Sequence, residues 1–111
     1  MRVTARGGRG MIRGETITTR ITGFPVAIED IREMYVIFST SSSIVMEKSL
    51  EDCTLDTERQ AISFRLTQEE SLKLKTGNIQ RSVIVVTNDG SRFESHPSEF
   101  RVYETKKGEV I

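Results

Sequence analysis

The most reactive side chains in this chain are its one cysteine and one histidine, Cys53 and His96. A cysteine held beside a histidine is a typical pair for nucleophilic catalysis. These two residues are far apart in the sequence, however, and the carboxylate of Asp52 raises rather than lowers the pKa of a neighbouring thiol. We therefore interpret Cys53 as a small, half-buried filler and His96, which precedes Pro97, as a solvated loop residue.

The acidic residues do not form a recognisable catalytic or metal site. General acid–base catalysis needs two carboxyls that face each other across a cleft in different environments. The two adjacent pairs here, Glu29-Asp30 and Glu69-Glu70, have side chains that diverge. Acidic loop residues could bind calcium, but the spacing of an EF-hand is absent. The loop residues considered are Glu51, Asp52, Asp56, Glu58 and Asp89. We expect no catalytic residue, no cofactor and no metal ion.

Basic residues are concentrated at the start of the chain. Residues 1–14 contain four arginines and no acid, whereas the remaining 97 residues carry a net charge of −4. The arginines are Arg2, Arg6, Arg9 and Arg13. We interpret residues 1–14 as a flexible basic arm that could reach a phosphate backbone or an acidic neighbouring subunit. Binding of nucleic acid through these arginines is thus an alternative function, although no aromatic residue lies among them to stack on bases.

The glycines of this arm do not form a nucleotide-binding motif. No strand precedes Gly7-Gly8-Arg9-Gly10 and no lysine follows it, so neither a phosphate loop nor a dinucleotide fingerprint is present. Purine-rich codons of a ribosome-binding site would give such a string if they were translated. Our hypothesis is that Met11 is the biological start and that residues 1–10 are an upstream extension; a genuine arm is the alternative.

Length and composition predict one globular domain. The chain has 111 residues, of which 36% are hydrophobic and 29% are charged. This balance excludes a membrane protein and argues against disorder. A single cysteine excludes a disulfide framework. No apolar stretch is typical of a signal peptide or of a membrane span, so we do not expect export or a membrane partner.

Short alternating segments separated by turn residues predict an all-β fold. Thr67 and Glu70 form a capping box that should begin one short helix ending near Leu72, and Asn88-Asp89-Gly90 should form a hairpin turn. We predict an immunoglobulin-like β-sandwich of about seven short strands over residues 15–105, with a frayed tail at 106–111. A small closed barrel is the alternative. The expected strands are 16–22, 31–39, 44–50, 53–56, 61–66, 79–87, 91–95 and 99–103.

Two of these segments are apolar on both faces, at Tyr35–Phe38 and Val83–Val86. We interpret these segments first as two central strands that are buried within the sandwich without any partner. The alternative is that one face builds the core and the other is covered by the arm or by a neighbouring subunit. The candidate contact residues are Tyr35, Ile37, Ile84 and Val86. The predicted edge strand Glu99–Tyr103 offers a second route to a partner, through strand pairing.

Four segments resemble a family of small phage and prophage proteins from Gram-positive bacteria of the gut. They are Met11–Thr16, Glu51–Leu55, Leu66–Glu70 and Val85–Gly90. The resemblance covers residues 11–103, and members of the family typically begin at the position of Met11. The order of elements is also similar to the N-terminal domain of siphophage upper baseplate proteins, a β-sandwich that anchors a receptor-binding device. This chain differs by having no helical or receptor-binding region after the sandwich.

The resemblance implies a non-enzymatic structural protein of a phage particle, located in the head, neck or tail. Its expected partners are other virion proteins or copies of itself, and it would be present in the host cytoplasm during assembly. Neither a membrane nor a small-molecule substrate is expected.

Overall fold

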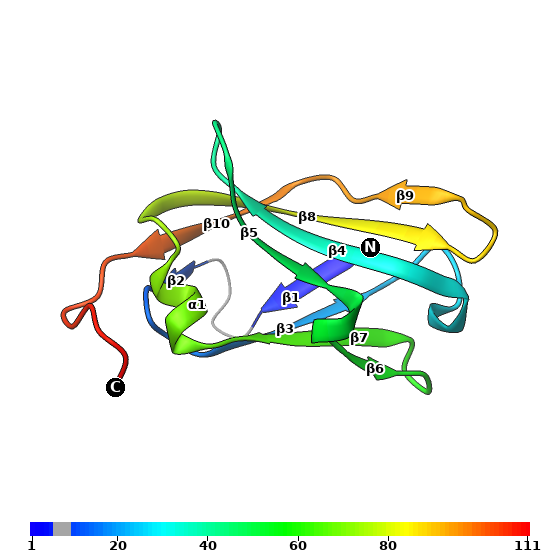
Figure 1. Ribbon diagram of the computed structural model, residues 1–111, viewed down its shortest axis with the longest axis horizontal. Helices are drawn as coiled ribbons and strands as arrows, with labels where there is room; N and C mark the ends of the chain where they lie inside the picture. The colour runs from blue at the N-terminus through cyan, green and yellow to red at the C-terminus, as the bar shows by residue number, and fades with distance from the viewer. Residues whose placement is uncertain (6–9) are drawn as a thin grey trace.

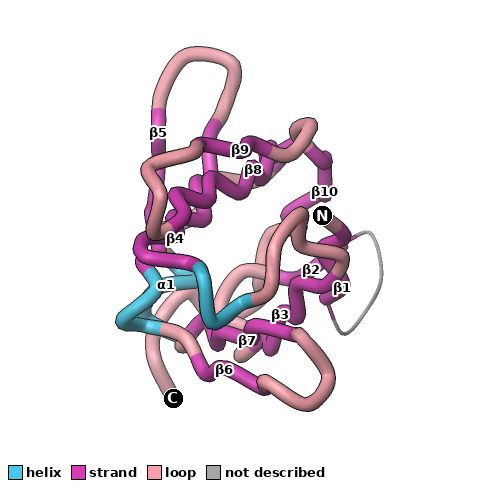
Figure 2. The backbone as a smooth tube through the Cα atoms, turned by 90° about the vertical axis from the view of Figure 1, so that its right-hand side faces the viewer, coloured by secondary structure: helices cyan, strands magenta, loops and turns pink. Residues whose placement is uncertain are grey.

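The computed structural model describes residues 1–5 and 10–111, which form two β-sheets packed face to face (Figures 1 and 2). The four-stranded sheet has the order β1-β3-β7-β6 and the six-stranded sheet the order β2-β10-β8-β4-β5, with β9 also paired to β8. The bounds of the first sheet are β1 Arg2–Ala5, β3 Ile17–Thr22, β7 Ala61–Leu66 and β6 Thr54–Asp56. Those of the second are β2 Gly10–Ile12, β10 Ser98–Tyr103, β8 Gly77–Thr87, β4 Ile31–Ser39, β5 Ile44–Ser49 and β9 Arg92–Glu94.

This strand order confirms the predicted all-β sandwich and makes the closed barrel wrong, because the two sheets remain separate. In their order across the first sheet, β1, β3, β7 and β6 correspond to strands A, B, E and D of an immunoglobulin-like sandwich. In the second sheet, β4, β8 and β10 correspond to strands C, F and G. The described residues contain ten strands rather than about seven. The strands that the sequence did not predict are β1 and β2, because the break at Pro97 between β9 and β10 was already expected.

Side chains from the inner faces of both sheets form the core. Phe38 packs edge-to-face against Phe64, with ring centroids 6.1 Å apart, and against Phe100 at 6.0 Å. Phe38 and Phe100 come from the six-stranded sheet and Phe64 from the other, so this cluster joins the two layers. The predicted core positions of β7 are confirmed, since Ile62, Phe64 and Leu66 are all buried.

Short helices connect the strands: η1 (Ile28–Asp30), η2 (Leu50–Asp52) and α1 (Gln68–Leu72). The capping box is confirmed at α1. The Thr67 hydroxyl accepts a hydrogen bond from the Glu70 backbone N–H at 3.2 Å, and the Glu70 carboxylate accepts one from the Thr67 N–H at 3.1 Å. Among the described residues, no helix is both long and apolar enough to cross a membrane.

The prediction of a flexible arm is wrong for residues 2–5 and 10–12. Strand β1 pairs antiparallel with β3, and β2 pairs parallel with β10. Met11 is only 6% exposed and belongs to the core. A Cβ atom at Gly10 would lie 3.0 Å from the Tyr103 ring, so glycine at this position allows close strand approach. Such short strands complete existing sheet edges and need no alternating pattern of their own.

Two further expectations are corrected near the end of the chain. Strand β10 is not an edge strand, because β2 pairs with Arg101–Tyr103 on the side away from β8. The tail 106–111 is not frayed at Ile111. The Ile111 N–H donates to the Gln68 side-chain oxygen at 2.9 Å, and the Gln68 amide donates to the Ile111 carbonyl at 3.2 Å.

Candidate functional site

The structure brings the four predicted contact residues together on the outer face of the six-stranded sheet. Val36 of β4 and Val83 and Val85 of β8 point into the core, so their neighbours in sequence point outward. We name Tyr35, Ile37, Ile84 and Val86 the outer patch. Tyr35 lies directly opposite Ile84 in the strand register.

The outer patch is partly buried by its own neighbours and is not covered by the arm. Strand β1 belongs to the other sheet, and β2 lies at the edge beyond β10. Polar and charged residues border the patch instead. Glu47 of β5 lies opposite Ile37, and Glu94 of β9 lies opposite Ile84. An apolar centre with a polar rim is the general arrangement of protein contact surfaces.

Sequence reasoning missed a second apolar pair on the same face, formed by Ile12 and Tyr103. They lie opposite each other across β2 and β10 and are 46% and 53% exposed. The guanidinium of Arg101 sits 5.6 Å from the centre of the Tyr103 ring. Alternation along the predicted strand 99–103 is the signal that would have placed Tyr103 outward. No signal placed Ile12, because residues 1–14 were interpreted as a flexible arm.

The four arginines of the predicted arm do not act as one group. Arg13 donates to the Glu104 carboxylate at 2.6 Å and to the Leu72 carbonyl at 2.7 Å, so it ties the start of the chain to the sandwich. Arg2 is exposed on β1. Arg6 and Arg9 lie outside the described residues. Because Arg13 is committed to internal contacts, the nucleic-acid alternative loses one of its four predicted residues.

Cys53 and His96 are not brought together. Cys53 lies next to β6 of the four-stranded sheet, whereas His96 is exposed between β9 and β10 of the other sheet. The Cys53 thiol donates to the Ser49 carbonyl at 3.3 Å. Burial, together with the charge of Asp52, raises the pKa of the Cys53 thiol to about 11. At neutral pH this group is therefore a thiol rather than a thiolate.

Several carboxylates considered as catalytic or metal-binding groups take part in local structure instead. Asp89 accepts hydrogen bonds from the Thr87 hydroxyl and, at 3.0 Å, from the Ser91 N–H, and these lower its pKa to about 2. Asp56 accepts from the Arg59 N–H at 3.1 Å. Within residues 1–5 and 10–111, no three His, Cys, Asp or Glu side chains are grouped so as to hold a metal ion.

Glu70 of the predicted carboxylate pair has two structural roles. One of its oxygens caps α1, and the other lies 2.5 Å from the ammonium of Lys48. Partial burial acts to raise the pKa of Glu70, but the hydrogen bonds from Lys48 and Thr67 outweigh it and hold the pKa below its usual value. The carboxylate therefore remains ionised at neutral pH, which suits an ion pair.

Comparison with known proteins gives no family. No protein-family model matches the chain. No curated protein matches it either. What the chain does is therefore inferred from its own residues.

Proposed function

We propose that this protein is a non-enzymatic structural component that works by protein–protein assembly, with the outer patch as its contact surface. The observation that carries the proposal is the position of Tyr35, Ile37, Ile84 and Val86. Four apolar side chains from two adjacent central strands share the face that points away from the core. Covering such a face with a partner removes apolar surface from water, which is favourable.

The setting that we propose is a phage or prophage particle, in which the partners are other virion proteins or further copies of this chain. Support for this setting comes from the resemblance of four segments to small phage proteins. In the fold, two of these segments form the capped start of α1 and the turn between β8 and β9. Both are structural features, so they support a shared architecture more directly than a shared partner.

The outer patch is tested by introducing a charge at its centre. In the Ile84→Lys variant, a partner that covers the outer patch would have to bury an added charged group, which is costly. The matched control is Leu55→Lys, because Leu55 is 43% exposed on β6 of the opposite sheet. Thermal unfolding followed by circular dichroism establishes that both variants fold.

Two measurements read the result: light scattering of the purified protein, and mass spectrometry of density-purified particles from a bacterium that produces each variant. We expect Ile84→Lys to lose self-association or incorporation into particles and Leu55→Lys to retain it. Equal behaviour of the two variants would refute the outer patch as the contact. A wild-type protein that is monomeric and absent from particles would refute the assembly role.

A further inference from the structure

Strand β4 has an open edge beside the outer patch. On one side, β8 pairs with β4 from Ile31 to Ser39. On the other side, pairing with β5 begins only at Tyr35 of β4. Tyr35 lies opposite Ser49, the last residue of β5, and after Ser49 the chain leaves the sheet and enters η2. In the part of the chain that the structure describes, residues 31–34 of β4 therefore have a strand on one side only (Figure 1).

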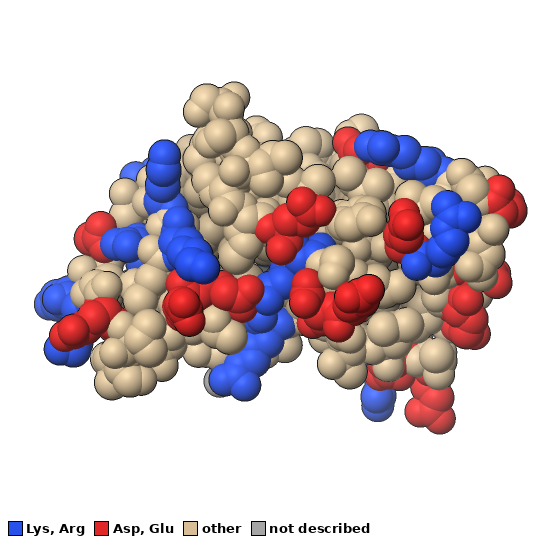
Figure 3. All heavy atoms as spheres, in the orientation of Figure 1, with Lys and Arg blue, Asp and Glu red and all other residues tan. Residues whose placement is uncertain are grey.

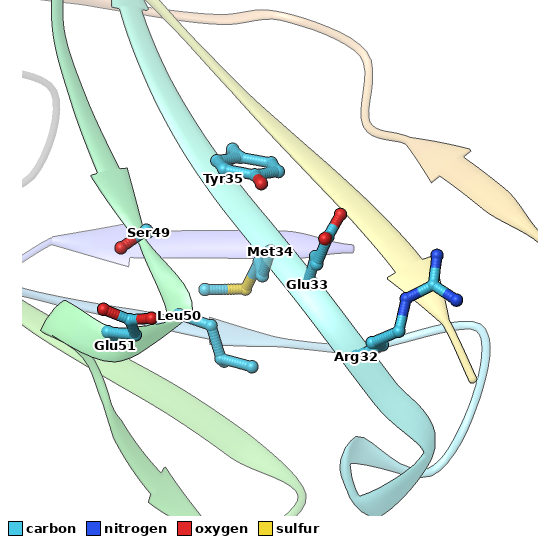
Figure 4. Close-up of a pocket in the computed structure, with 7 residues that line it drawn as sticks. All are labelled: Arg32, Glu33, Met34, Tyr35, Ser49, Leu50 and Glu51. Carbon is cyan, nitrogen blue, oxygen red and sulfur yellow. The ribbon is translucent and has the colours of Figure 1, made fainter. Parts of the chain in front are cut away.

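A hollow of about 250 Å³ lies where β5 leaves β4, and we name it the β4 notch. Figure 4 shows that Glu33 and Tyr35 project from one side of β4, while Met34 projects from the other side towards Leu50. Side chains that alternate beside an open strand edge are what an added strand recognises: the main chain supplies affinity, and the pockets supply specificity. The lining residues are Arg32, Glu33, Met34, Tyr35, Ser49, Leu50 and Glu51.

The fold limits how strands can add at this side of the sheet. Lys48 is an inward-pointing charge on edge strand β5, and such a residue discourages another strand from pairing there. The register of β4 against β8 shifts between Ile31 and Glu33, a bulge that limits regular pairing to a short stretch. The β4 notch thus suits a short extended segment rather than a long strand of another sheet.

The charges around the β4 notch favour a basic occupant. Glu33 and Glu51 line it, and Asp52 follows directly in η2. The Ser49 N–H and hydroxyl donate to Asp52 at 2.9 and 3.1 Å and lower its pKa, so it stays ionised. Against these carboxylates the lining contains one cation, Arg32. Figure 3 shows acidic side chains along the middle of the face that carries β5 and η2, with basic side chains between them.

We propose that the β4 notch binds a short, extended, basic segment of a partner protein as an added β-strand. The segment would pair with the main chain of residues 31–34, place an apolar side chain towards Leu50 and place basic side chains beside Glu33 and Glu51. The proposal rests on the proposed function only in that the chain acts by binding protein. It does not require the outer patch to be the contact.

Binding is measured on the full chain by nuclear magnetic resonance, with synthetic peptides as probes. The test peptide is Lys-Val-Lys-Val-Lys with blocked ends. One control is Glu-Val-Glu-Val-Glu, which keeps the β-propensity and reverses the charge. The other is the lysine peptide with N-methyl groups on alternate amides, prepared in both alternations, which removes the main-chain donors needed for strand pairing. We expect the lysine peptide to shift the amide signals of residues 31–35 and 49–51.

Charge variants then locate the site. We expect the Glu33→Gln/Glu51→Gln double variant to bind the lysine peptide about 3- to 10-fold more weakly, since each exposed ion pair contributes little by itself. The matched control is Glu58→Gln, in the exposed turn between β6 and β7, which should bind as the wild type does. At least one N-methylated peptide should lose binding.

The proposal would be overturned by no binding, by equal binding of the acidic peptide, or by signal changes away from the β4 notch. Unchanged binding of both N-methylated peptides would overturn strand addition and indicate simple charge attraction. The Ile84→Lys variant separates this proposal from the proposed function. If Ile84→Lys abolishes assembly while the wild type ignores the peptide, only the β4 notch fails. If the peptide binds the wild type while the protein is monomeric and absent from particles, only the assembly role fails.

Discussion

The ammonium of Lys48 lies 2.5 Å from the carboxylate of Glu70, and this ion pair joins the edge strand β5 to helix α1. The Lys48 side chain is only 10% exposed, whereas that of Glu70 is 28% exposed. The contact therefore fixes the C-terminal end of β5 to α1, the helix that comes directly after β7 of the four-stranded sheet. It also holds the strand end from which the β4 notch is formed.

Removing the charge of Glu70 should lower the free energy of unfolding more than removing the charge of Lys48. Glu70→Gln keeps a side chain that is able to cap α1 but leaves the Lys48 ammonium buried without a counter-charge, so we expect a loss of about 1–3 kcal/mol in the free energy of unfolding. Lys48→Met keeps the apolar stem and removes the charge, and should cost less. Urea denaturation of both single variants and the double variant measures the coupling. Equal losses with no coupling would contradict this account.

The turn between β8 and β9 should contribute to the acid sensitivity of the fold. The pKa of Asp89 is about 2 in the folded chain against an ordinary value of 3.8. A carboxyl group whose pKa is lowered by folding contributes its full stabilisation when the pH is above its ordinary pKa. This contribution is lost as the pH falls from about 4 towards 2. Over this pH range, we expect the urea midpoint of Asp89→Asn to fall less steeply than that of the wild type. Glu58→Gln is the charge-matched control, and an equal flattening in both would refute the role of Asp89.

The cap of α1 predicts a loss specific to one hydroxyl group. In Thr67→Ala the Glu70 N–H loses its acceptor, so we expect a loss of about 1 kcal/mol in the free energy of unfolding. Thr67→Ser retains the hydroxyl and should stay within a few tenths of the wild type. Urea denaturation measures both variants. A serine variant as unstable as the alanine variant would show that packing, rather than capping, explains the effect.

The sandwich was predictable because its signals are local. Alternation at Ile62, Phe64 and Leu66 identifies a half-buried strand, and the Thr67–Glu70 spacing identifies a helix start without knowledge of the rest of the fold. The outer patch was predictable for the same reason. Once both strands are paired and Val83 faces the core, Ile84 must face outward.

The first strands and the β4 notch depend on long-range pairing, which leaves little trace in composition. Strand β2 forms because β10 offers an unpaired edge, and nothing in Gly10-Met11-Ile12 indicates that partner. The position at which β5 leaves β4 follows from the capping of η2 by Ser49 and Asp52 and from the Lys48–Glu70 pair. Neither contact could be assigned before the strands were placed in space.

The thiol of Cys53 should be slow to react in the folded chain. Its raised pKa, about 11, leaves little thiolate at pH 8, and the thiolate is the reactive form. We expect alkylation by iodoacetamide to be about 10- to 100-fold slower in the native protein than in urea. Mass spectrometry over time measures both rates. A native rate equal to the unfolded rate would revive Cys53 as a candidate nucleophile.

Deletion of residues 1–10 should destabilise the domain, because β1 is part of the four-stranded sheet rather than a loose arm. Val3 lies opposite Ile21 and packs against the core, and removing it exposes the edge of β3. An exposed strand edge pairs readily with other chains, so we expect a lower urea midpoint together with concentration-dependent association. The variant Val3→Ala separates the lost side chain from the lost strand: it should lower the midpoint less and remain monodisperse under conditions where the wild type is so. A truncated chain that begins at Met11 and matches the wild type in both measurements would show that the sandwich does not need β1.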